Sequence, residues 1–133
     1  MIEYMNIKSA SREEFIDITG RIQKIIDNSG IREGLCVVYI PHTTAGITIN
    51  EDADPDVIND IKNYLDRMVP NAEYFKHLEG NSPAHIKSSI IGHSITVPVS
   101  EGGLLLGRWQ GIFFCEFDGP RSRQIIVKII GED

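Results

Sequence analysis

Hydrophobic positions follow two different periods along the chain, and this difference separates predicted strands from predicted helices. Short runs that alternate, or that are continuously apolar and rich in β-branched residues, are typical of strands. Such runs occupy residues 3–8, 35–40, 44–50, 94–99, 104–106, 111–117 and 124–130. Pro41 interrupts the chain between the second and third runs, and turn sequences at 102–103 and 118–120 separate the later ones.

The first helix is predicted directly after Ser11-Arg12-Glu13-Glu14, which has the capping-box pattern. In that pattern Ser11 and Glu14 satisfy each other's free backbone amides. Apolar residues at helical spacing follow, namely Phe15, Ile18, Ile22, Ile25 and Ile26. Gly30 is expected to end this helix.

Two further helices are predicted in the middle of the chain. Asp54 is expected to cap the second, with Pro55 in its first turn and Pro70 beyond its end. A polar loop over residues 70–82 leads to a short third helix that opens with Asn81-Ser82-Pro83. Strands gather towards the C-terminus without regular βαβ alternation. The pattern therefore predicts an α+β fold with a mostly antiparallel sheet and about three helices.

The composition fits one globular domain over residues 1–133. Hydrophobic residues make up 41% and charged residues 24% of the chain, so it can bury a core without a disulfide or a metal. Cys36 and Cys115 lie inside apolar runs and are expected to be buried structural thiols. The start of the chain lacks a signal-peptide pattern, and no run approaches the roughly 18 apolar residues of a membrane span. A cytoplasmic location is the expectation.

The overall charge bears on the class of partner. A formal net charge of −6 disfavours nucleic acid as a partner, because phosphate backbones select basic surfaces. Arg108, Arg121 and Arg123 lie close together in the sequence and could form a local site for a small phosphate. They could equally be solvated strand ends, and the sequence leaves both interpretations open.

Three of the four histidines lie in polar, turn-rich segments. His42 follows a strand break, His77 lies in the polar loop, and His85 lies near the start of the third helix. Three imidazoles and a water are a common ligand set for catalytic zinc. Their spacing is not a known zinc signature, so each could instead hydrogen-bond its own turn. His93, at the head of a strand, is interpreted as a structural or surface residue.

Two carboxylates and the start of the third helix also allow more than one interpretation. Glu51 could orient an imidazole or move a proton, or it could lie in a solvated loop. Glu116 stands in an apolar strand, so it either faces solvent or is held by a partner, because burying a lone carboxylate is costly. Lys87 and Ser88, near free amides of a helix N-terminus, would suit a phosphate, but every helix has such an end.

Four sequence blocks occur in order along nearly the whole chain. They are His42-Thr43-Thr44-Ala45 with Asn50-Glu51, His77 with Glu79-Gly80, Ala84-His85-Ile86-Lys87-Ser88-Ser89, and Gly107-Arg108-Trp109-Gln110-Gly111 with Glu116. Together they resemble the YjbQ family, whose members carry the label secondary thiamine-phosphate synthase. The resemblance implies an α/β sandwich assembled as a homotrimer. It also implies that His42, His77 and His85 share a pocket at or near a subunit interface, with a metal, usually zinc, and anions such as phosphate.

The expected function is a metal-assisted enzyme acting on a small phosphorylated heterocycle, with the weak thiamine-phosphate synthase activity that the resemblance implies. The expected metal ligands are His42, His77 and His85, the expected anion-binding residues are Lys87, Ser88, Arg108 and Arg121, and the expected acid–base or supporting residues are Glu116 and Glu51. Magnesium is the alternative metal with a diphosphate substrate, although it prefers oxygen ligands. The competing hypotheses are a non-catalytic trimer that binds a metal and a small anionic metabolite, and a metal-dependent hydrolase of unknown substrate.

The aromatic residues of the C-terminal strands also indicate an oligomer, for which the resemblance implies a homotrimer. Trp109, Phe113 and Phe114 give these strands more aromatic surface than one small core readily covers, and such residues favour interfaces. All three could instead pack inside, and the sequence leaves this alternative open.

Overall fold

The structure is a computed structural model that describes residues 1–72 and 74–132. Its strands are β1 (Ile2–Lys8), β2 (Glu14–Asp17), β3 (Gly34–Tyr39), β4 (Ala45–Glu51), β5 (Ser94–Ser100), β6 (Gly103–Leu104), β7 (Gln110–Glu116) and β8 (Ser122–Gly131). Its helices are α1 (Thr19–Ser29), α2 (Pro55–Met68) and α3 (Ser82–Ile91). The fold is α+β, as the sequence predicts.

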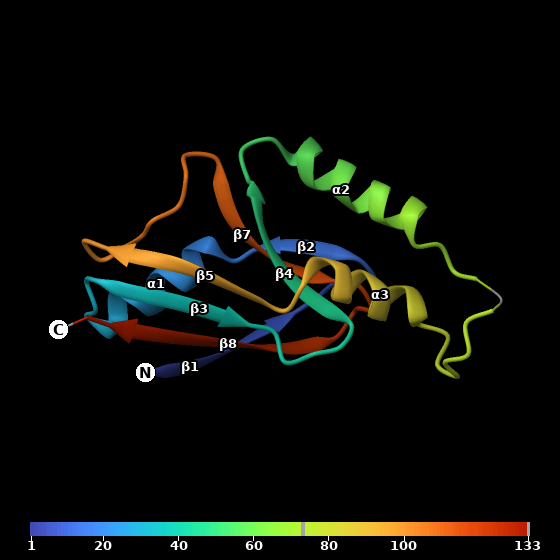
Figure 1. The fold of residues 1–133 in the computed structure, drawn as a ribbon, viewed down its shortest axis with the longest axis horizontal. Helices are drawn as coiled ribbons and strands as arrows, with labels where there is room; N and C mark the ends of the chain where they lie inside the picture. Colours follow the sequence, from blue (N-terminus) through green and yellow to red (C-terminus); the bar gives the residue numbers. More distant parts are fainter. Residues whose placement is uncertain (73, 133) are drawn as a thin grey trace.

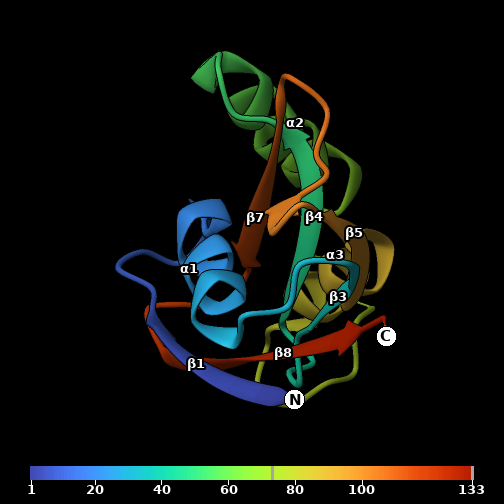
Figure 2. The ribbon, with the colours of Figure 1, turned by 90° about the vertical axis from the view of Figure 1, so that its left-hand side faces the viewer.

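The strands form two antiparallel sheets. One has five strands in the order β1-β8-β3-β5-β6, and the other has three in the order β2-β7-β4. Figure 2 shows α1 above β1 and β8 of the five-stranded sheet, and Figure 1 shows α2 and α3 beside β4 of the three-stranded sheet. No helix in the described part of the chain is long and apolar enough to cross a membrane.

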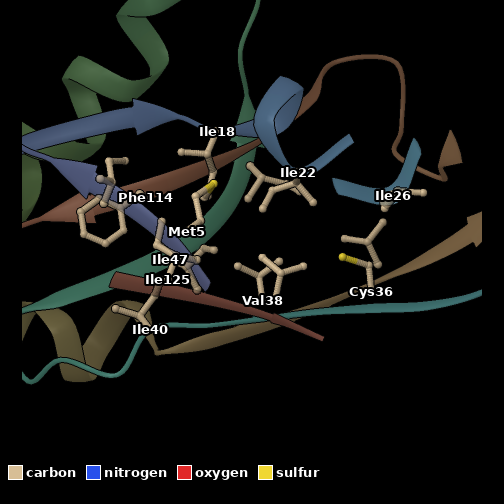
Figure 3. Close-up of a cluster of buried hydrophobic side chains, with 14 of the residues drawn as sticks. Met5, Ile18, Ile22, Ile26, Cys36, Val38, Ile40, Ile47, Phe114 and Ile125 are labelled. Carbon is tan, nitrogen blue, oxygen red and sulfur yellow. The ribbon is translucent and has the colours of Figure 1, made fainter. Parts of the chain in front are cut away.

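The main core lies between the two sheets and α1 (Figure 3). Alternate residues of β3 and β8 point into it, including Cys36, Val38, Ile125 and Val127. A second cluster, with Ile58, Leu65, Phe113 and Phe117, joins α2 to the other face of the three-stranded sheet. Cys36 and Cys115 are both fully buried, which confirms their prediction as structural thiols.

The predicted start of the first helix is wrong. Residues 14–17 form β2, which pairs with β7, and the helix begins only at Thr19. Instead of forming a capping box, Glu14 accepts a hydrogen bond from the backbone N of Ala10. Pairing with β7 and burial of Phe15 and Ile16 against the core override the local helical pattern. The predicted end is confirmed, since Gly30 has the left-handed φ of 73° that glycine favours.

The second and third helices begin as predicted. The side chain of Asp54 accepts a hydrogen bond from the backbone N of Asp56, with Pro55 in the first turn of α2. Asn81 precedes α3, and Pro83 lies in its first turn.

Two aromatic residues that were expected to supply interface area lie in the core. Phe113 and Phe114 are 6% and 0% exposed, because β7 is the central strand of its sheet and is covered on both faces. Trp109 remains 54% exposed. Exposed apolar residues instead gather on the outer face of the five-stranded sheet, where Tyr4 and Tyr39 both pair with Ile126.

Candidate functional site

The five-stranded sheet ends at Pro41, and the imidazole of His42 lies beside β8 just beyond this point. The register pairs Tyr39 with Ile126, so its continuation would pair residue 41 with Gln124. The backbone N and O of Gln124 lie 3.0 and 3.1 Å from His42 Nε2. The ring of His42 is therefore fixed by backbone atoms at the edge of the sheet.

A pocket of about 720 Å³ opens beside His42. Its wall includes all four histidines and two arginines, namely His42, His77, His85, His93, Arg121 and Arg123. They come from the loop after β3, the loop before α3, the first turn of α3, the start of β5 and the start of β8. These segments meet at one end of the molecule, near α3 in Figure 1.

Two of the predicted ligands, His77 and His85, are in direct contact. Their rings meet edge to face, with centroids 5.0 Å apart and an interplanar angle of 86°. His77 Nε2 also lies 3.9 Å from Glu79 Oε1. His42 lines the same pocket, so the structure brings the three predicted imidazoles to one site.

The residue types at this site fit a zinc ion, because neutral imidazole is its common ligand. In residues 1–72 and 74–132, however, no three His, Cys, Asp or Glu side chains stand close enough together to hold one ion. Holding an ion through His42, His77 and His85 would need a change of side-chain rotamer. His77 has room for one, since 43% of its side chain is exposed.

One of the arginines that line this pocket, Arg123, belongs to a buried ion pair with Glu116. Arg123 is 6% exposed and Glu116 is completely buried. Arg123 Nε donates to Glu116 Oε1 at 2.9 Å, and its Nη2 donates to the second carboxylate oxygen and to Thr44 Oγ1. The Ser9 hydroxyl and the backbone N of Asp118 also donate to Glu116. Of the two alternatives for Glu116, the structure shows the one in which a partner holds it.

Burial and the charges of this ion pair shift the pKa values of Glu116 and His42. Burial by itself would raise the pKa of Glu116, but the hydrogen bonds from Arg123, Asp118 and Ser9 outweigh it and hold that pKa below its usual value. A carboxylate bound in this way stays ionised and is poorly suited to exchange protons. Burial lowers the pKa of His42, and the nearby charge of Arg123 lowers it further. His42 is therefore held towards its neutral form, which is the form that binds metals.

A second polar chain runs along the pocket wall. Arg121 Nη2 donates to Asp118 Oδ2 at 2.9 Å, and Asn81 Nδ2 donates to the same oxygen at 2.7 Å. Since a carboxylate only accepts, these bonds fix which end of the Asn81 amide is nitrogen. Asn81 Oδ1 is buried and has no hydrogen-bond partner among the described residues.

The structure does not bring Lys87 or Ser88 to the pocket. Lys87 is 3% exposed, and its ammonium binds Glu13 at 2.5 Å and also Asp66. Ser88 is fully buried, and its hydroxyl donates to the backbone oxygens of Thr43 and His85. Both side chains thus join α3 to neighbouring segments, and their polar groups are already occupied.

Replacing Lys87 with methionine should lower the free energy of unfolding by about 2 kcal/mol. The change leaves Glu13 without its partner, and burial already raises the pKa of that carboxyl above its usual value. The loss should fall below the cost of breaking a fully buried pair, since Asp66 is 53% exposed. Denaturant unfolding measures it, with Lys24→Met on the exposed face of α1 as the matched control. Equal midpoints for Lys87→Met and its parent would contradict this role.

Glu51 and Arg108 also lie away from the histidine pocket. Glu51 is the last residue of β4, and its carboxylate accepts from the backbone N of Asp54, as in the solvated-loop interpretation. Six residues of extended strand, about 20 Å, separate it from Ala45 at the histidine end. Arg108 lies with its guanidinium carbon 5.0 Å from the centroid of the Trp109 ring.

The N-terminus of α3 offers fewer free amides than a typical helix. The backbone N atoms of Ala84 and His85 both donate to the Asn81 oxygen, and Pro83 has no N–H. Of the first three residues of the helix, Ser82 alone keeps an N–H without a backbone partner in the described structure. Arg121 and Arg123, which line the pocket, are therefore stronger candidates for holding an anion than this helix end.

Three residues of the pocket were not singled out correctly from the sequence. His93 was interpreted as a structural or surface residue and was not connected with the other histidines, whose pocket it lines. Ile40 N donates to its backbone oxygen and joins the start of β5 to the end of β3. Asn81 was seen only as the residue before a helix. Arg123 was named only as part of a basic cluster. Its partner, Glu116, lies seven residues earlier on the other side of a turn, and no local sequence pattern indicates such a pairing.

Comparison with known proteins agrees with the fold and with the family resemblance. The family model of the UPF0047 protein YjbQ-like group matches residues 3–132. A UPF0047 protein of Methanocaldococcus jannaschii is 55% identical over 99% of this chain and 96% of its own. YugU of Bacillus subtilis, also a UPF0047 protein, is 49% identical over 98% of this chain and 100% of its own.

Solved structures of relatives share the architecture. An uncharacterized conserved protein of the YjbQ/UPF0047 family from Clostridium acetobutylicum is 52% identical and has a TM-score of 0.93, over 96% of this chain and 99% of that one. A YbjQ-like protein of unknown function from Sulfolobus solfataricus is 34% identical, with a TM-score of 0.94 over 99% of this chain and 97% of that one. The chain therefore belongs to the YjbQ (UPF0047) family.

Proposed function

We propose that this protein is a metal-assisted enzyme that acts on a small phosphorylated metabolite bound in the histidine pocket. The observation that carries the proposal is the gathering of four imidazoles and two guanidinium groups around one cavity. Imidazoles suit a zinc-like cation, and guanidinium groups suit a phosphate. A pocket of about 720 Å³ has the volume of a small-molecule site.

Arg121 and Arg123 would contribute to phosphate binding in different ways. The side chain of Arg121 is half exposed. Its hydrogen bonds to Asp118 fix the orientation of the guanidinium group and leave part of it accessible to a ligand. Arg123 is paired with the carboxylate of Glu116, so it would present the positive end of a fixed dipole to the pocket and not a free cation. An ion pair of this kind costs no reorganisation when charge develops on the ligand.

The metal would be held by His42, His77 and His85. When bound, a divalent cation would stabilise negative charge on a phosphate oxygen or on a leaving group. Zinc is the proposed ion because of its preference for nitrogen ligands, and magnesium would need oxygens from the ligand itself. Glu79, close to His77, is the carboxylate best placed to support an imidazole of this set.

Thiamine-phosphate synthesis remains the specific reaction proposed on family resemblance. The structure adds nothing that selects its heterocycles, and transfer from a diphosphate normally uses oxygen-bound magnesium. Hydrolysis of a phosphorylated metabolite and non-catalytic binding of a metal with an anion are the two alternatives. All three share the pocket, and turnover separates them.

A homotrimer is also proposed. It is supported by the apolar outer face of the five-stranded sheet, with Tyr4, Leu35, Tyr39 and Ile130 exposed. Large exposed apolar areas mark protein contacts, and Tyr39 lies between this face and the pocket. Light scattering at micromolar concentration tests the assembly, and a monomer would contradict it.

Turnover of a panel of phosphorylated metabolites should depend on added zinc and on both arginine and histidine groups. The panel should include a hydroxymethylpyrimidine diphosphate with a thiazole phosphate, and simple phosphate monoesters. Arg121→Met should weaken substrate binding about tenfold, as loss of one charge-assisted hydrogen bond predicts. Arg108→Met, which changes an exposed arginine outside the pocket, is the matched control. Activity that is equal with zinc and with chelator would exclude metal assistance, and no turnover with retained binding would favour the non-catalytic alternative.

A further inference from the structure

The hydrogen-bonding direction of β8 shows which of its residues face β3. Ser9 N donates to Arg121 O, and Ile129 N donates to Met1 O, so odd-numbered residues of β8 bond towards β1. In an antiparallel ladder the N–H and C=O of one residue point to the same neighbour, and successive residues alternate. Gln124 therefore directs both of its backbone groups towards β3.

Residue 41 is where β3 would meet those groups, and it is a proline. The register of β3 and β8 places residue 41 opposite Gln124. Proline cannot donate, and it diverts the strand. The His42 ring enters the vacated position, with Nε2 at hydrogen-bond distance from both groups of Gln124. In the Pro41-His42 pair, the imidazole of His42 thus takes the place of the backbone hydrogen bonds that residue 41 would otherwise make with Gln124.

We propose that this arrangement reserves Nε2 of His42 for the Gln124 backbone and makes Nδ1 the atom that acts on a ligand. The inference rests on the proposed function, because it names how His42 would meet a cation or a phosphate. The two nitrogens of an imidazole lie on different edges of the ring, so a ring anchored through Nε2 presents Nδ1. Nδ1 has no hydrogen-bond partner among the residues that the structure describes, and the ring lines the pocket.

The Gln124 backbone can serve either neutral tautomer of His42. If Nε2 accepts from the Gln124 N–H, Nδ1 carries the proton and donates to an anion. If Nε2 carries the proton, it donates to the Gln124 oxygen, and the Nδ1 lone pair faces a cation. Metal-binding histidines commonly donate their second N–H to a backbone oxygen in this way. The ring can therefore meet a phosphate or a metal without losing its anchor.

The anchor is tested in metal-free protein by hydrogen exchange of the Gln124 amide. His42→Ala should speed that exchange about tenfold, as expected for the loss of one hydrogen bond. His42→Gln, whose amide reaches the position of Nε2, should keep most of the protection, whereas the shorter His42→Asn should not. The comparison of the Gln and Asn variants remains decisive if the Ala variant folds poorly. Equal Gln124 exchange in all the variants and the parent would overturn the anchor.

The acting atom is tested by nitrogen-15 spectra of the histidine rings, with cadmium ion and then inorganic phosphate as probes. Each probe should shift Nδ1 of His42 more than Nε2, and cadmium-113 should couple to Nδ1. Coupling to Nε2, or a larger shift there, would overturn the assignment. If neither probe perturbs the ring while Gln124 stays protected, the proposed function and the ligand role of Nδ1 fail, and the anchor alone stands.

Discussion

Arg123→Met should lower the free energy of unfolding by about 3 to 4 kcal/mol, the largest stability effect expected outside the apolar core. The change leaves the carboxylate of Glu116 in a fully buried position without its positive partner. Breaking such a pair from one side typically costs about 3–5 kcal/mol. The bonds from Ser9 and from the Asp118 backbone remain and keep the loss towards the lower end.

Denaturant unfolding of three further variants identifies the cause. Adding Glu116→Gln to Arg123→Met should restore part of the stability, because the amide removes the buried charge. Its oxygen can still accept from the backbone N of Asp118, and its NH2 group can donate to the hydroxyl oxygen of Ser9. Arg121→Met is the matched control, since its ion pair is half exposed and should be worth less than about 1 kcal/mol. Similar losses for Arg121→Met and Arg123→Met would contradict the importance of burial.

The same pair predicts how stability changes with pH. The pKa of Glu116 is lower in the folded protein than its ordinary value of 4.5. Its contribution is therefore fully present above pH 4.5 and is lost as the pH falls through the folded pKa. In Arg123→Met the lone carboxylate should instead favour protonation, so the stability gap between parent and variant should narrow on acidification. A gap that widens below pH 5 would show that other groups dominate.

His85→Ala should weaken zinc binding by at least about 100-fold while leaving the metal-free fold intact. Loss of a direct ligand should exceed the 10–100-fold effect of changing a supporting residue. The His85 side chain forms no hydrogen bond within the described residues, and it contacts the ring of His77 edge to face. Truncation should therefore cost less than about 1 kcal/mol in stability.

The stabilities of His85→Ala and its parent have to be compared in chelator. Otherwise an ion that binds only the native state would stabilise the parent by mass action. Calorimetric zinc titration then measures affinity, and thermal unfolding in chelator measures the fold. His93→Ala, in the same pocket but outside the proposed ligand set, should lose less than about tenfold in affinity. A chelated His85→Ala that melts well below its parent and still binds zinc normally would make His85 a structural residue.

The sequence predicted correctly those helix starts and ends that depend on residues close to them in the chain. The cap of α2 depends on Asp54 and Pro55, and the end of α1 depends on Gly30, so sequence and structure agree there. β2 was missed because its residues have helical spacing, and only their pairing with β7 makes them a strand. Sequence order could not show that pairing.

The site also contains residues that could be identified from the sequence and residues whose role depends on contacts between distant segments. His42, His77 and His85 stand in turns, and family resemblance identified them as a group that the structure brings to one pocket. Lys87 looked like a phosphate ligand because it lies near a helix N-terminus, yet its ammonium is paired with Glu13 and Asp66 and does not line the pocket. Whether a lysine can bind a ligand depends on whether carboxylates from distant segments already pair with it. A single sequence does not show which segments come together. The proposed role of Pro41 likewise depends on its register against β8.

Anomalous diffraction at the zinc edge, from crystals of protein purified without chelator, tests the central proposal most directly. The proposal predicts a peak in the pocket within about 2.0–2.1 Å of one ring nitrogen of each of His42, His77 and His85. For His42 that nitrogen should be Nδ1. A crystal soaked in excess zinc that shows no peak there, or shows one only at surface carboxylates, would contradict a metal-assisted function for this pocket.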